Sequence, residues 1–279
     1  MLLLIDAGNS NVKWATISQG QKNIEFGGGF SLSQPTESII ACFEKNWGHL
    51  NPIQIQISHV GSKPFSILLQ SWIQAKWPIQ PAYLKSEVRR AGLINGYSNP
   101  MQLGVDRWLA LLAAHCFYKQ DNKALCIVDS GTCLKVDILT AKGSHAGGYI
   151  LPGKEMMIQS VEALLLLNGK SIRQTKMNGG ESPPFNGSQK NTLDGITAGV
   201  DFSQIAVIEK LCRDMAKEFG PSCQIILTGG GAQALTQFAQ SHAILYSPHL
   251  VLEGIAAYSC PNLLNKKHVQ KQATSFIPA

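Results

Sequence analysis

Two short apolar runs, each ending in a single aspartate, organise the hydrophobic pattern of this chain. Residues 2–5 (Leu-Leu-Leu-Ile) end at Asp6, and residues 125–128 (Leu-Cys-Ile-Val) end at Asp129. A continuous apolar run of this length indicates a strand that is buried on both faces. Each run is followed by a glycine-containing turn and then by a second segment of strand-forming residues. The same strand–turn–strand unit therefore occurs twice, 123 residues apart.

The rest of the chain carries strand and helix patterns in mixed order. Alternating or continuous apolar positions predict strands at residues 12–17, 24–30, 53–57, 134–139, 146–151 and 224–227. Helical spacing predicts helices at residues 36–47, 65–77, 106–117, 156–167, 202–219 and 250–259. Isoleucines alternate with polar residues over 53–57, so this strand is predicted to have one solvent-exposed face. Segments rich in glycine, asparagine and proline at 90–103 and 169–191 are predicted to be loops, the second of them mobile.

This order of elements predicts an α/β fold. Because the strand–turn–strand unit is repeated, we expect two similar halves, residues 1–118 and residues 119–279. A ligand is expected in the cleft between them, since binding sites are concave and often lie where two domains meet.

Composition narrows the classes of protein. With 44% hydrophobic and 15% charged residues, a chain of 279 residues can build a large core, which excludes a disordered, collagen-like or coiled-coil protein. No apolar run approaches the roughly 20 residues that span a bilayer. Asp6 also ends the first apolar run too early for a secretion signal. We therefore expect a cytoplasmic protein without a membrane partner.

Charge and metal-ligand spacing add further exclusions. The net charge is +6, and the dense basic stretch at 266–271 is interpreted as a solvated tail, so no nucleic-acid partner is expected. The seven cysteines contain no C-x-x-C pair, which disfavours a disulfide framework or a zinc site. The seven histidines show no metal-binding spacing and are interpreted as structural.

The turns after the two apolar runs carry the candidate chemistry. They read Asp-x-Gly-Asn from Asp6 and Asp-x-Gly-Thr from Asp129. Glycine allows close backbone approach, exposed N–H groups cradle phosphate, and the aspartate can hold a metal ion directly or through water. One such turn alone is more typical of a plain β-turn, but two after matching strands favour a polyphosphate clamp.

A third glycine-rich turn runs from Thr228 through Gly229 and Gly230 to Gly231, after a predicted strand. Its glycines permit close approach to a flat or phosphorylated ligand, or they simply meet a need for positive φ. The sequence leaves both interpretations open.

Six segments in a fixed order now resemble one family. They are Asp-Ala-Gly-Asn-Ser-Asn from Asp6, Gly-Val-Asp-Arg from Gly104, Asp-Ser-Gly-Thr from Asp129, Gly-Gly-Tyr-Ile-Leu-Pro-Gly from Gly147, Asn191-Thr192, and Thr-Gly-Gly from Thr228. The chain resembles the type III pantothenate kinases. This resemblance implies two ribonuclease-H-like halves of the actin-like ATPase superfamily, with ATP in the central cleft.

The resemblance also implies an activity and roles. The chain would transfer the γ-phosphoryl group of ATP to the 4′-hydroxyl of pantothenate, the first step of coenzyme A biosynthesis, with Asp106 as the general base. Asp6 would hold Mg²⁺, directly or through water, and Asp129 a monovalent cation, potassium or ammonium. A homodimer is implied, with the acceptor site close to the subunit interface. Residues implied at the ATP phosphates are Asp6, Ala7, Gly8, Asn9, Ser10, Asn11, Val12, Lys13, Gly131, Thr132, Gly229 and Gly230. Residues implied at pantothenate are Tyr97, Gly104, Val105, Asp106, Arg107 and Thr192.

Four of these side chains have a simpler structural interpretation. Asp106 stands at a predicted helix start and could act only as a helix cap. Arg107 has the planar fork that suits a carboxylate, or it forms a surface ion pair. Lys13 meets a phosphate or points outward from its strand. Tyr97 contacts the acceptor or anchors a loop in the core.

The chain departs from the family pattern in the second phosphate turn, which usually continues Ala-x-Thr-x-Asp. Here Cys133 replaces the alanine and Lys135 replaces the threonine. Lys135 adds a cation beside the cleft, where it would supply charge itself and alter cation dependence, or it points outward from the strand. His249 also stands before the last helix, where the family more often has aspartate.

Two other functions compete with the kinase. A family relative without turnover would act as an accessory regulator of transcription, and a related kinase would use another acceptor. The presence of Asp6, Asp106, Asp129 and Thr132 favours the enzyme, and the Gly-x-Asp-Arg segment favours pantothenate as the acceptor.

Overall fold

The computed structural model describes residues 1–279 except 22, 168–188, 220–222, 236–243, 261–273 and 277–279. The basic stretch 266–271 and most of the predicted loop 169–191 lie outside the described residues. Within the described residues, no helix is long and apolar enough to cross a membrane.

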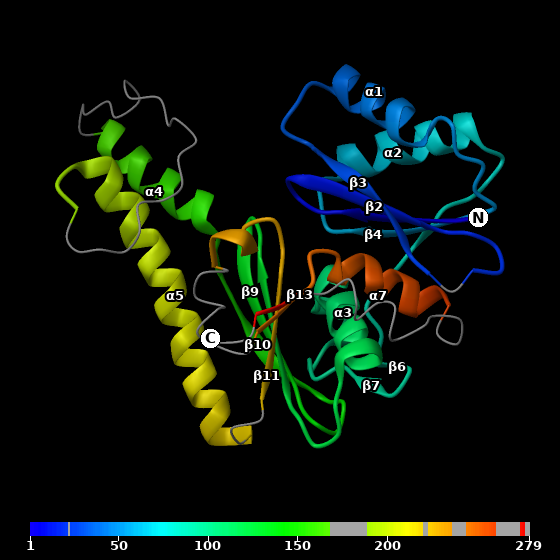
Figure 1. The fold of residues 1–279 in the computed structure, drawn as a ribbon. Helices are drawn as coiled ribbons and strands as arrows, with labels where there is room; N and C mark the ends of the chain where they lie inside the picture. The colour runs from blue at the N-terminus through cyan, green and yellow to red at the C-terminus, as the bar shows by residue number, and fades with distance from the viewer. Residues whose placement is uncertain (22, 168–188, 220–222, 236–243, 261–273, 277–279) are drawn as a thin grey trace.

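The first half is a five-stranded sheet with two helices on its outer face (Figure 1). Its strand order is β3-β2-β1-β4-β5, with β1 antiparallel to β2 and parallel to β4. The strands are β1 (Leu2–Ala7), β2 (Asn11–Ile17), β3 (Glu25–Ser31), β4 (Gln54–His59) and β5 (Ala82–Tyr83). The helices α1 (Thr36–Trp47) and α2 (Lys63–Lys76) pack on the sheet through an aromatic core that includes Phe43 and Trp47.

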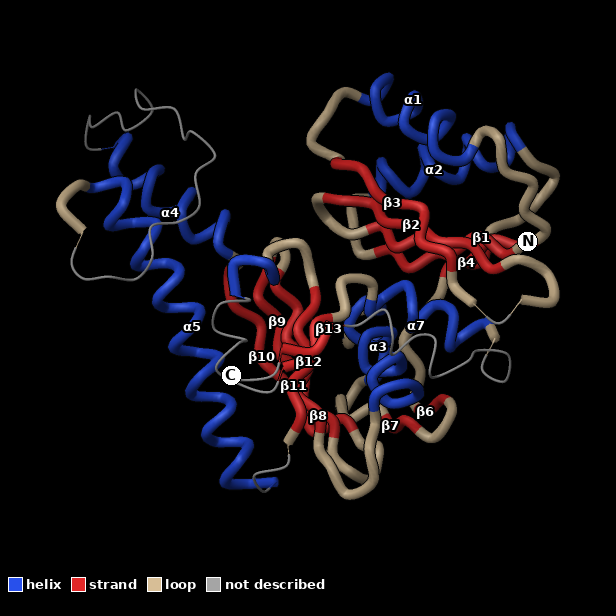
Figure 2. The backbone as a smooth tube through the Cα atoms, viewed as in Figure 1, coloured by secondary structure: helices blue, strands red, loops and turns tan. Residues whose placement is uncertain are grey.

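The second half repeats this arrangement with one strand added. Its order is β10-β9-β8-β11-β12-β13, and its first five strands have the same directions as β3-β2-β1-β4-β5. The strands are β8 (Leu125–Ser130), β9 (Cys133–Leu139), β10 (His145–Pro152), β11 (Gln224–Thr228), β12 (Ile244–Tyr246) and β13 (Thr274–Phe276). The helices α4 (Lys154–Leu167) and α5 (Thr192–Phe219) lie on the outer side (Figure 2). The expected α/β fold of two ribonuclease-H-like halves is confirmed by this repeated topology.

The segment between the sheets carries the shorter elements. Two short strands, β6 (Arg89–Arg90) and β7 (Leu93–Ile94), and the 3₁₀ turn η1 (Pro100–Gln102) precede α3 (Val105–Ala113). A π-helical turn, η2 (Ala114–Tyr118), continues α3 to the start of the second half. In the second half, η3 (Ala232–Leu235) follows β11, and α7 (Leu250–Ser259) follows β12.

Helices α3 and α7 join the two sheets (Figure 1). They pack against each other, and the apolar cluster around them includes Leu4 of the first sheet and Ile127 of the second. Helix α7 belongs to the second half in sequence, yet it packs on β1, β2 and β4 of the first. The halves therefore share one continuous apolar core, and the ends of β1 and β8 are held opposite each other.

The strand predicted at 53–57 is present as β4, but the prediction that one of its faces is exposed to solvent was wrong. The strand begins at Gln54, and Ile53 before it is exposed. Within the strand, Gln56 and Ser58 are 7% and 0% exposed, because α3 and α7 cover the face opposite the outer helices. Polar alternation therefore did not mark a solvent-facing side, since both faces of this sheet are packed.

Candidate functional site

The two Asp-Gly turns face each other across a cleft. The hydroxyls of Ser10 and Thr132 lie 2.8 Å apart and share a hydrogen bond, although 122 positions separate them in the chain. The cleft is lined by Asp6, Gly8, Asn9, Ser10, Asn11, Lys13, Val60, Asp106, Asp129, Gly131, Thr132, Cys133, Lys135, Thr228, Gly229, Gly230, Pro248, His249, Val251 and Leu252. The structure thus brings most of the predicted phosphate-binding residues to one place. Ala7 and Val12 are buried within β1 and β2 beside it.

Asp6 is partly buried, and within the described residues its carboxyl group forms no ion pair. Among the described residues its Oδ1 has no hydrogen-bond partner. Burial raises the pKa of Asp6 to about 7, and the negative charges of Asp106 and Asp129 act in the same direction, while Lys13 opposes them. An unpartnered buried carboxylate oxygen is costly unless a cation or proton meets it, so the site is suited to a cation.

Lys13 is the cross-strand neighbour of Asp6, because the two residues are register partners in β1 and β2. Its Nζ does not pair with Asp6 but donates to the carbonyl oxygen of Pro248 at 3.0 Å. This bond spans the cleft to the segment just before α7. The hypothesis that Lys13 points outward from its strand was wrong, since its side chain lines the cleft.

The third glycine turn lies beside the second Asp-Gly turn, since Thr228 and Asp129 are register partners in the parallel pair β11 and β8. Gly229 has φ of +96°, and a Cβ there would lie 2.5 Å from Oδ1 of Asp129. Glycine is therefore required by the backbone conformation and by the close approach of the two turns. The interpretation based on positive φ is confirmed. Close approach to a ligand stays a prediction, and Gly229 lies at the cleft where it would occur.

Asp106 lies in the first turn of α3 and reaches into the cleft. Gly104 is the N-cap residue of this helix. Oδ1 of Asp106 accepts the backbone N–H of Arg107 at 2.9 Å, and Oδ2 accepts a hydrogen bond from the side chain of Lys135. Asp106 is thus more than a helix cap, because one of its oxygens is directed to groups from the second half.

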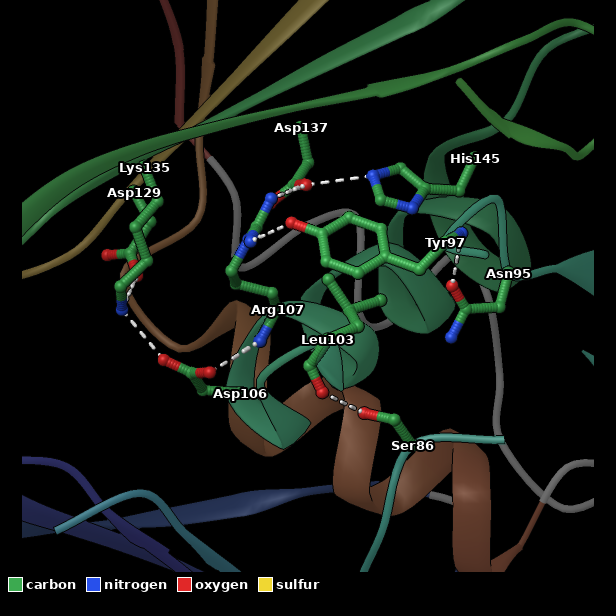
Figure 3. Close-up of polar contacts among 10 residues, drawn as sticks. All are labelled: Ser86, Asn95, Tyr97, Leu103, Asp106, Arg107, Asp129, Lys135, Asp137 and His145. Atoms are coloured by element: carbon green, nitrogen blue, oxygen red, sulfur yellow. Dashed lines mark hydrogen bonds and ion pairs between the residues drawn. The ribbon is translucent and has the colours of Figure 1, made fainter. Parts of the chain in front are cut away.

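Lys135 lies between two carboxylates (Figure 3). Its Nζ donates to Oδ2 of Asp106 at 2.7 Å and to Oδ2 of Asp129 at 3.1 Å. Burial would lower the pKa of Lys135, but the charges of Asp129 and Asp106 outweigh burial and raise the pKa above its usual value. Of the two positions predicted for Lys135, the one beside the cleft is confirmed, and the outward one is wrong.

Arg107 is buried beside these groups. Its Nε and Nη2 donate to the two oxygens of Asp137 at 2.8 and 2.6 Å, and its Nη1 donates to the Tyr97 hydroxyl at 2.7 Å (Figure 3). Burial would raise the pKa of Asp137, but hydrogen bonds from His145 and Arg107 hold it below the usual value. A surface ion pair was the wrong alternative for Arg107, which is 5% exposed. The bidentate fork that suits a carboxylate ligand is already engaged by Asp137.

Sequence analysis named Tyr97 beside Arg107 but missed the buried groups Asp137 and His145. Nε2 of His145 and Oδ1 of Asp137 form a buried hydrogen bond at 2.9 Å, and Tyr97 stacks on His145. One signal was present, because Asp137 follows Lys135 by two residues in β9 and side chains two apart share a face of a strand. His145 gave no comparable signal.

His249 departs from the family pattern at a structurally defined position. It is the N-cap residue of α7 and stacks on Phe26 with ring centroids 4.1 Å apart. Burial, and then the nearby charge of Lys13, lower the pKa of His249 to about 4. A neutral imidazole therefore closes this edge of the cleft at neutral pH.

Thr192 is the one predicted acceptor residue that lies far from this group. It begins α5, and α5 packs on the face of the second sheet opposite α3, through residues such as Ile208 and Met215 (Figure 1). Ile127 and Ile226, which belong to the cluster around α3 and α7, line the other face.

Comparison with known proteins adds an independent observation. A family model described as type III pantothenate kinase matches residues 2–214. The chain is 32% identical over 258 residues to the type III pantothenate kinase of Nitrosococcus oceani, covering 92% of each chain. It is 31% identical over 261 residues to that of Halorhodospira halophila, covering 93% of this chain and 98% of the relative.

One solved structure supports the fold. The activator of the 2-hydroxyisocaproyl-CoA dehydratase from Clostridium difficile, with bound ADPNP, aligns with a TM-score of 0.51 over 98% of each chain. At 11% sequence identity, this similarity concerns the fold alone.

Proposed function

This chain belongs to the type III pantothenate kinase family and therefore phosphorylates pantothenate with ATP in coenzyme A biosynthesis, and we propose that Asp106 is its general base. One observation carries this assignment: the Asp106 carboxylate projects from the first turn of α3 into the cleft that both Asp-Gly turns line. The relatives described above are named as kinases, and nothing in the comparisons favours the regulator of transcription.

The proposed step is a direct phosphoryl transfer. Asp106 accepts the proton of the pantothenate 4′-hydroxyl while that oxygen forms a bond to the γ-phosphorus of ATP. The bond between the γ-phosphorus and the β,γ-bridging oxygen breaks, and ADP leaves with that oxygen. Asp106 has an acceptor lone pair left for the proton, since Arg107 and Lys135 each donate a single hydrogen bond to it.

The two Asp-Gly turns and the third glycine turn are proposed to hold the ATP phosphates. Asn9, Ser10, Gly131, Thr132 and Gly230 are exposed at the cleft. The N–H of Gly131 already donates to the carbonyl oxygen of Cys133 at 3.1 Å, so the other N–H groups of these turns are the ones proposed to meet a ligand. Phosphate binding by successive backbone N–H groups needs this kind of open glycine turn. Lys13 adds a positive charge at the same edge.

The residues present fit Mg²⁺ at Asp6. Its buried, unpartnered Oδ1 is the kind of hard oxygen ligand that Mg²⁺ prefers. The described residues contain no cluster of three His, Cys, Asp or Glu side chains able to form a complete metal cage. A single carboxylate matches the way Mg²⁺ is usually held in kinases, with waters and substrate phosphates as its other ligands. The ion would neutralise charge on the phosphates.

The residues present do not fit a monovalent cation at Asp129. The Nζ of Lys135 already lies 3.1 Å from Oδ2 of Asp129. Potassium or ammonium beside that ammonium group would meet repulsion of about 4 kcal/mol at a separation of about 4 Å and an effective dielectric constant of about 20. No step is therefore assigned to such a cation.

For the acceptor site we propose the surface formed by Tyr97, Gly104, Val105 and Arg107 next to Asp106. Because Asp137 engages two nitrogens of Arg107, the third nitrogen and the Tyr97 hydroxyl that it contacts are the groups suited to hydrogen-bond pantothenate. Arg107 would orient pantothenate through this hydrogen bond. It would not by itself neutralise the pantothenate carboxylate, because Asp137 already pairs with its charge.

A homodimer is proposed from two observations. Thr192, implied at the acceptor site, lies on the opposite side of the second sheet, so a second copy is the natural source of this residue. The second half also exposes large apolar side chains, with Ile150 and Leu164 at 60% and Phe202 at 54%. Light scattering should give twice the chain mass of 30.2 kDa.

Two further proposals concern organisation and place. The halves are proposed to divide after Tyr118, as residues 1–118 and 119–279, because η2 ends there and β8 begins at Leu125. A cytoplasmic location is proposed because the cysteine pattern, odd in number and without C-x-x-C, lacks a disulfide framework.

The test of the base is Asp106→Asn in an assay of pantothenate-dependent ADP release. We expect kcat to fall by about 10²–10⁴-fold, the usual contribution of a general base. Asp121→Asn, the same substitution at an exposed turn, is the matched control and should keep wild-type kcat. Circular dichroism should show both variants folded. Activity of folded Asp106→Asn within a few-fold of the wild type would contradict the role of Asp106.

A further inference from the structure

Lys135 stands where the family motif usually has threonine, and it places a positive charge beside the cleft. Its ammonium group lies between a carboxylate of α3 and one of β8, with Asp106 at 2.7 Å and Asp129 at 3.1 Å (Figure 3). The side chains of the three residues are 20%, 11% and 21% exposed, so this contact is only partly accessible to solvent. A threonine at this position would have no positive charge, and its side chain would be too short to contact both carboxylates.

The fold fixes this position in three ways. Lys135 and Asp129 are register partners in the antiparallel pair β9 and β8, so their side chains share one face. The first turn of α3 presents Asp106 to the same face. The neighbouring side chain on that face, Asp137, holds Arg107 and so anchors the start of α3. A built-in cation therefore bridges the two halves at the cleft.

The ammonium group of lysine has the chemistry of an ammonium ion that is tethered to the chain. It is a compact charge with three hydrogen-bond donors. At this site its single positive charge offsets half of the negative charge of two carboxylates that would otherwise face the incoming phosphates. An external ammonium or potassium ion could do the same only if Lys135 were absent.

We propose that the Lys135 side chain replaces the monovalent cation in this kinase, so that turnover needs neither potassium nor ammonium. Lys135 acts as a positioning residue, because it holds Asp106 toward the acceptor and Asp129 toward the phosphate turns. This inference rests on the proposed phosphoryl-transfer site, and it concerns the charge beside Asp106 and not the identity of the base.

The first experiment needs no variant. Pantothenate-dependent ADP release is measured at constant ionic strength in potassium chloride, ammonium chloride or tetramethylammonium chloride, whose bulky cation has no N–H donor. We expect rates that agree within about twofold. A rate that is tenfold or more lower in tetramethylammonium chloride would overturn the proposal.

The second experiment opens the site. In tetramethylammonium chloride, Lys135→Ala and Lys135→Thr should lose at least about 100-fold in kcat. Ammonium, methylammonium or potassium should restore tenfold or more of that loss. Lys142→Ala, at an exposed position, is the matched control and should neither lose activity nor gain cation dependence. Lack of rescue in both folded Lys135 variants would overturn the proposal.

A third measurement reads the cation without turnover. The melting temperature of Lys135→Ala should rise when potassium chloride replaces tetramethylammonium chloride, and that of the wild type should not change. A cation-dependent rise in the wild type would contradict the proposal. Because melting does not depend on Asp106 chemistry, an active Asp106→Asn variant would reject the base and leave this result standing.

Discussion

The two hairpins that begin the halves look alike in sequence but use their charges differently. In each, an aspartate is the second-last residue of a strand with the same burial pattern, and a lysine is its register partner on the next strand. In the first half, Lys13 turns to the carbonyl of Pro248 and leaves Oδ1 of Asp6 unpartnered among the described residues. In the second half, Lys135 contacts Asp129 and also Asp106.

This difference shows how one duplicated unit acquires two roles. An unpartnered buried carboxylate is ready for an external cation, whereas a carboxylate paired with lysine already has one. The first hairpin is therefore suited to Mg²⁺ and the second to positioning of Asp106. A comparison of variants in the two hairpins tests this division of roles.

The largest effect on kcat is expected when the aspartate of each hairpin is replaced by asparagine, which removes its negative charge. Asp6→Asn should lower kcat by about 10³-fold, because the proposed Mg²⁺ site would lose its protein ligand. Asp129→Asn should lower kcat by about tenfold, comparable to the loss of one charged hydrogen bond, since Lys135 keeps its contact with Asp106. Initial-rate kinetics over a range of Mg²⁺ concentrations measures both. Equal losses in the two variants would show that the hairpins share one role.

The second prediction concerns the contact between α3 and α7. At Gly254 of α7, a Cβ would lie 2.0 Å from the carbonyl oxygen of Leu109 in α3. Gly254→Ala should therefore lower the free energy of unfolding by about 3 kcal/mol, as overpacking of a core does. Urea denaturation measures this loss.

Gly195→Ala is the matched control, since nothing lies within 4 Å of the new Cβ in α5. It should leave stability unchanged or raise it by about 0.5–1 kcal/mol, because alanine favours a helix. If Gly254→Ala were as stable as its control, α3 and α7 would not pack as closely at Gly254 as the structure shows.

The third prediction uses the acidic residues in the first turns of the same helices. Asp106 faces the cleft, whereas Glu253 is 1% exposed and accepts hydrogen bonds from Tyr118 and Ser247. Burial raises the pKa of Glu253 from 4.5 to about 7, and its two hydrogen bonds only partly oppose this. Because the pKa of Glu253 is higher in the folded protein than in the unfolded chain, its contribution to stability is fully present below the unfolded pKa. This contribution is lost as the pH rises through the folded pKa.

Glu253→Gln should remove this loss. Between pH 5 and pH 8 the wild type should lose up to roughly 3 kcal/mol relative to Glu253→Gln, at about 1.4 kcal/mol per pKa unit. Thermal melting at both pH values measures the difference. Glu37→Gln, at an exposed position of α1, should follow the wild type at both. Parallel pH profiles of Glu253→Gln and the wild type would show that Glu253 is ionised throughout.

Much of the fold could be predicted because it is written in local patterns. The apolar runs before Asp6 and Asp129 gave β1 and β8, and helical spacing gave α1 with both of its ends. The polar alternation in β4 misled, because burial there depends on α7, a helix almost two hundred residues away. The periodicity of apolar residues indicates which side chains share a face of an element, but it does not indicate what packs on that face.

The candidate site divides in the same way. The Asp-Gly turns and the Gly-x-Asp-Arg segment were visible as motifs, since their chemistry lies in adjacent residues. The buried groups Asp137 and His145 were not visible, because Asp137 reaches Arg107 from β9 and His145 contacts Asp137 from β10. Thr192 shows the opposite case. It was visible as part of a motif, but its helix α5 packs on the face of the second sheet opposite α3.

The sequence by itself determined the duplicated α/β architecture, the two aspartate turns and the family of this kinase, because these depend on residue type and short spacing. The tertiary structure decided which cation meets which carboxylate. Lys13 and Lys135 occupy equivalent register positions, yet Lys13 bonds a carbonyl 235 positions away and Lys135 a carboxylate 29 positions away. The approach of α3 and of the segment before α7 sets these partners, since a long charged side chain pairs with whatever group the packing brings within reach.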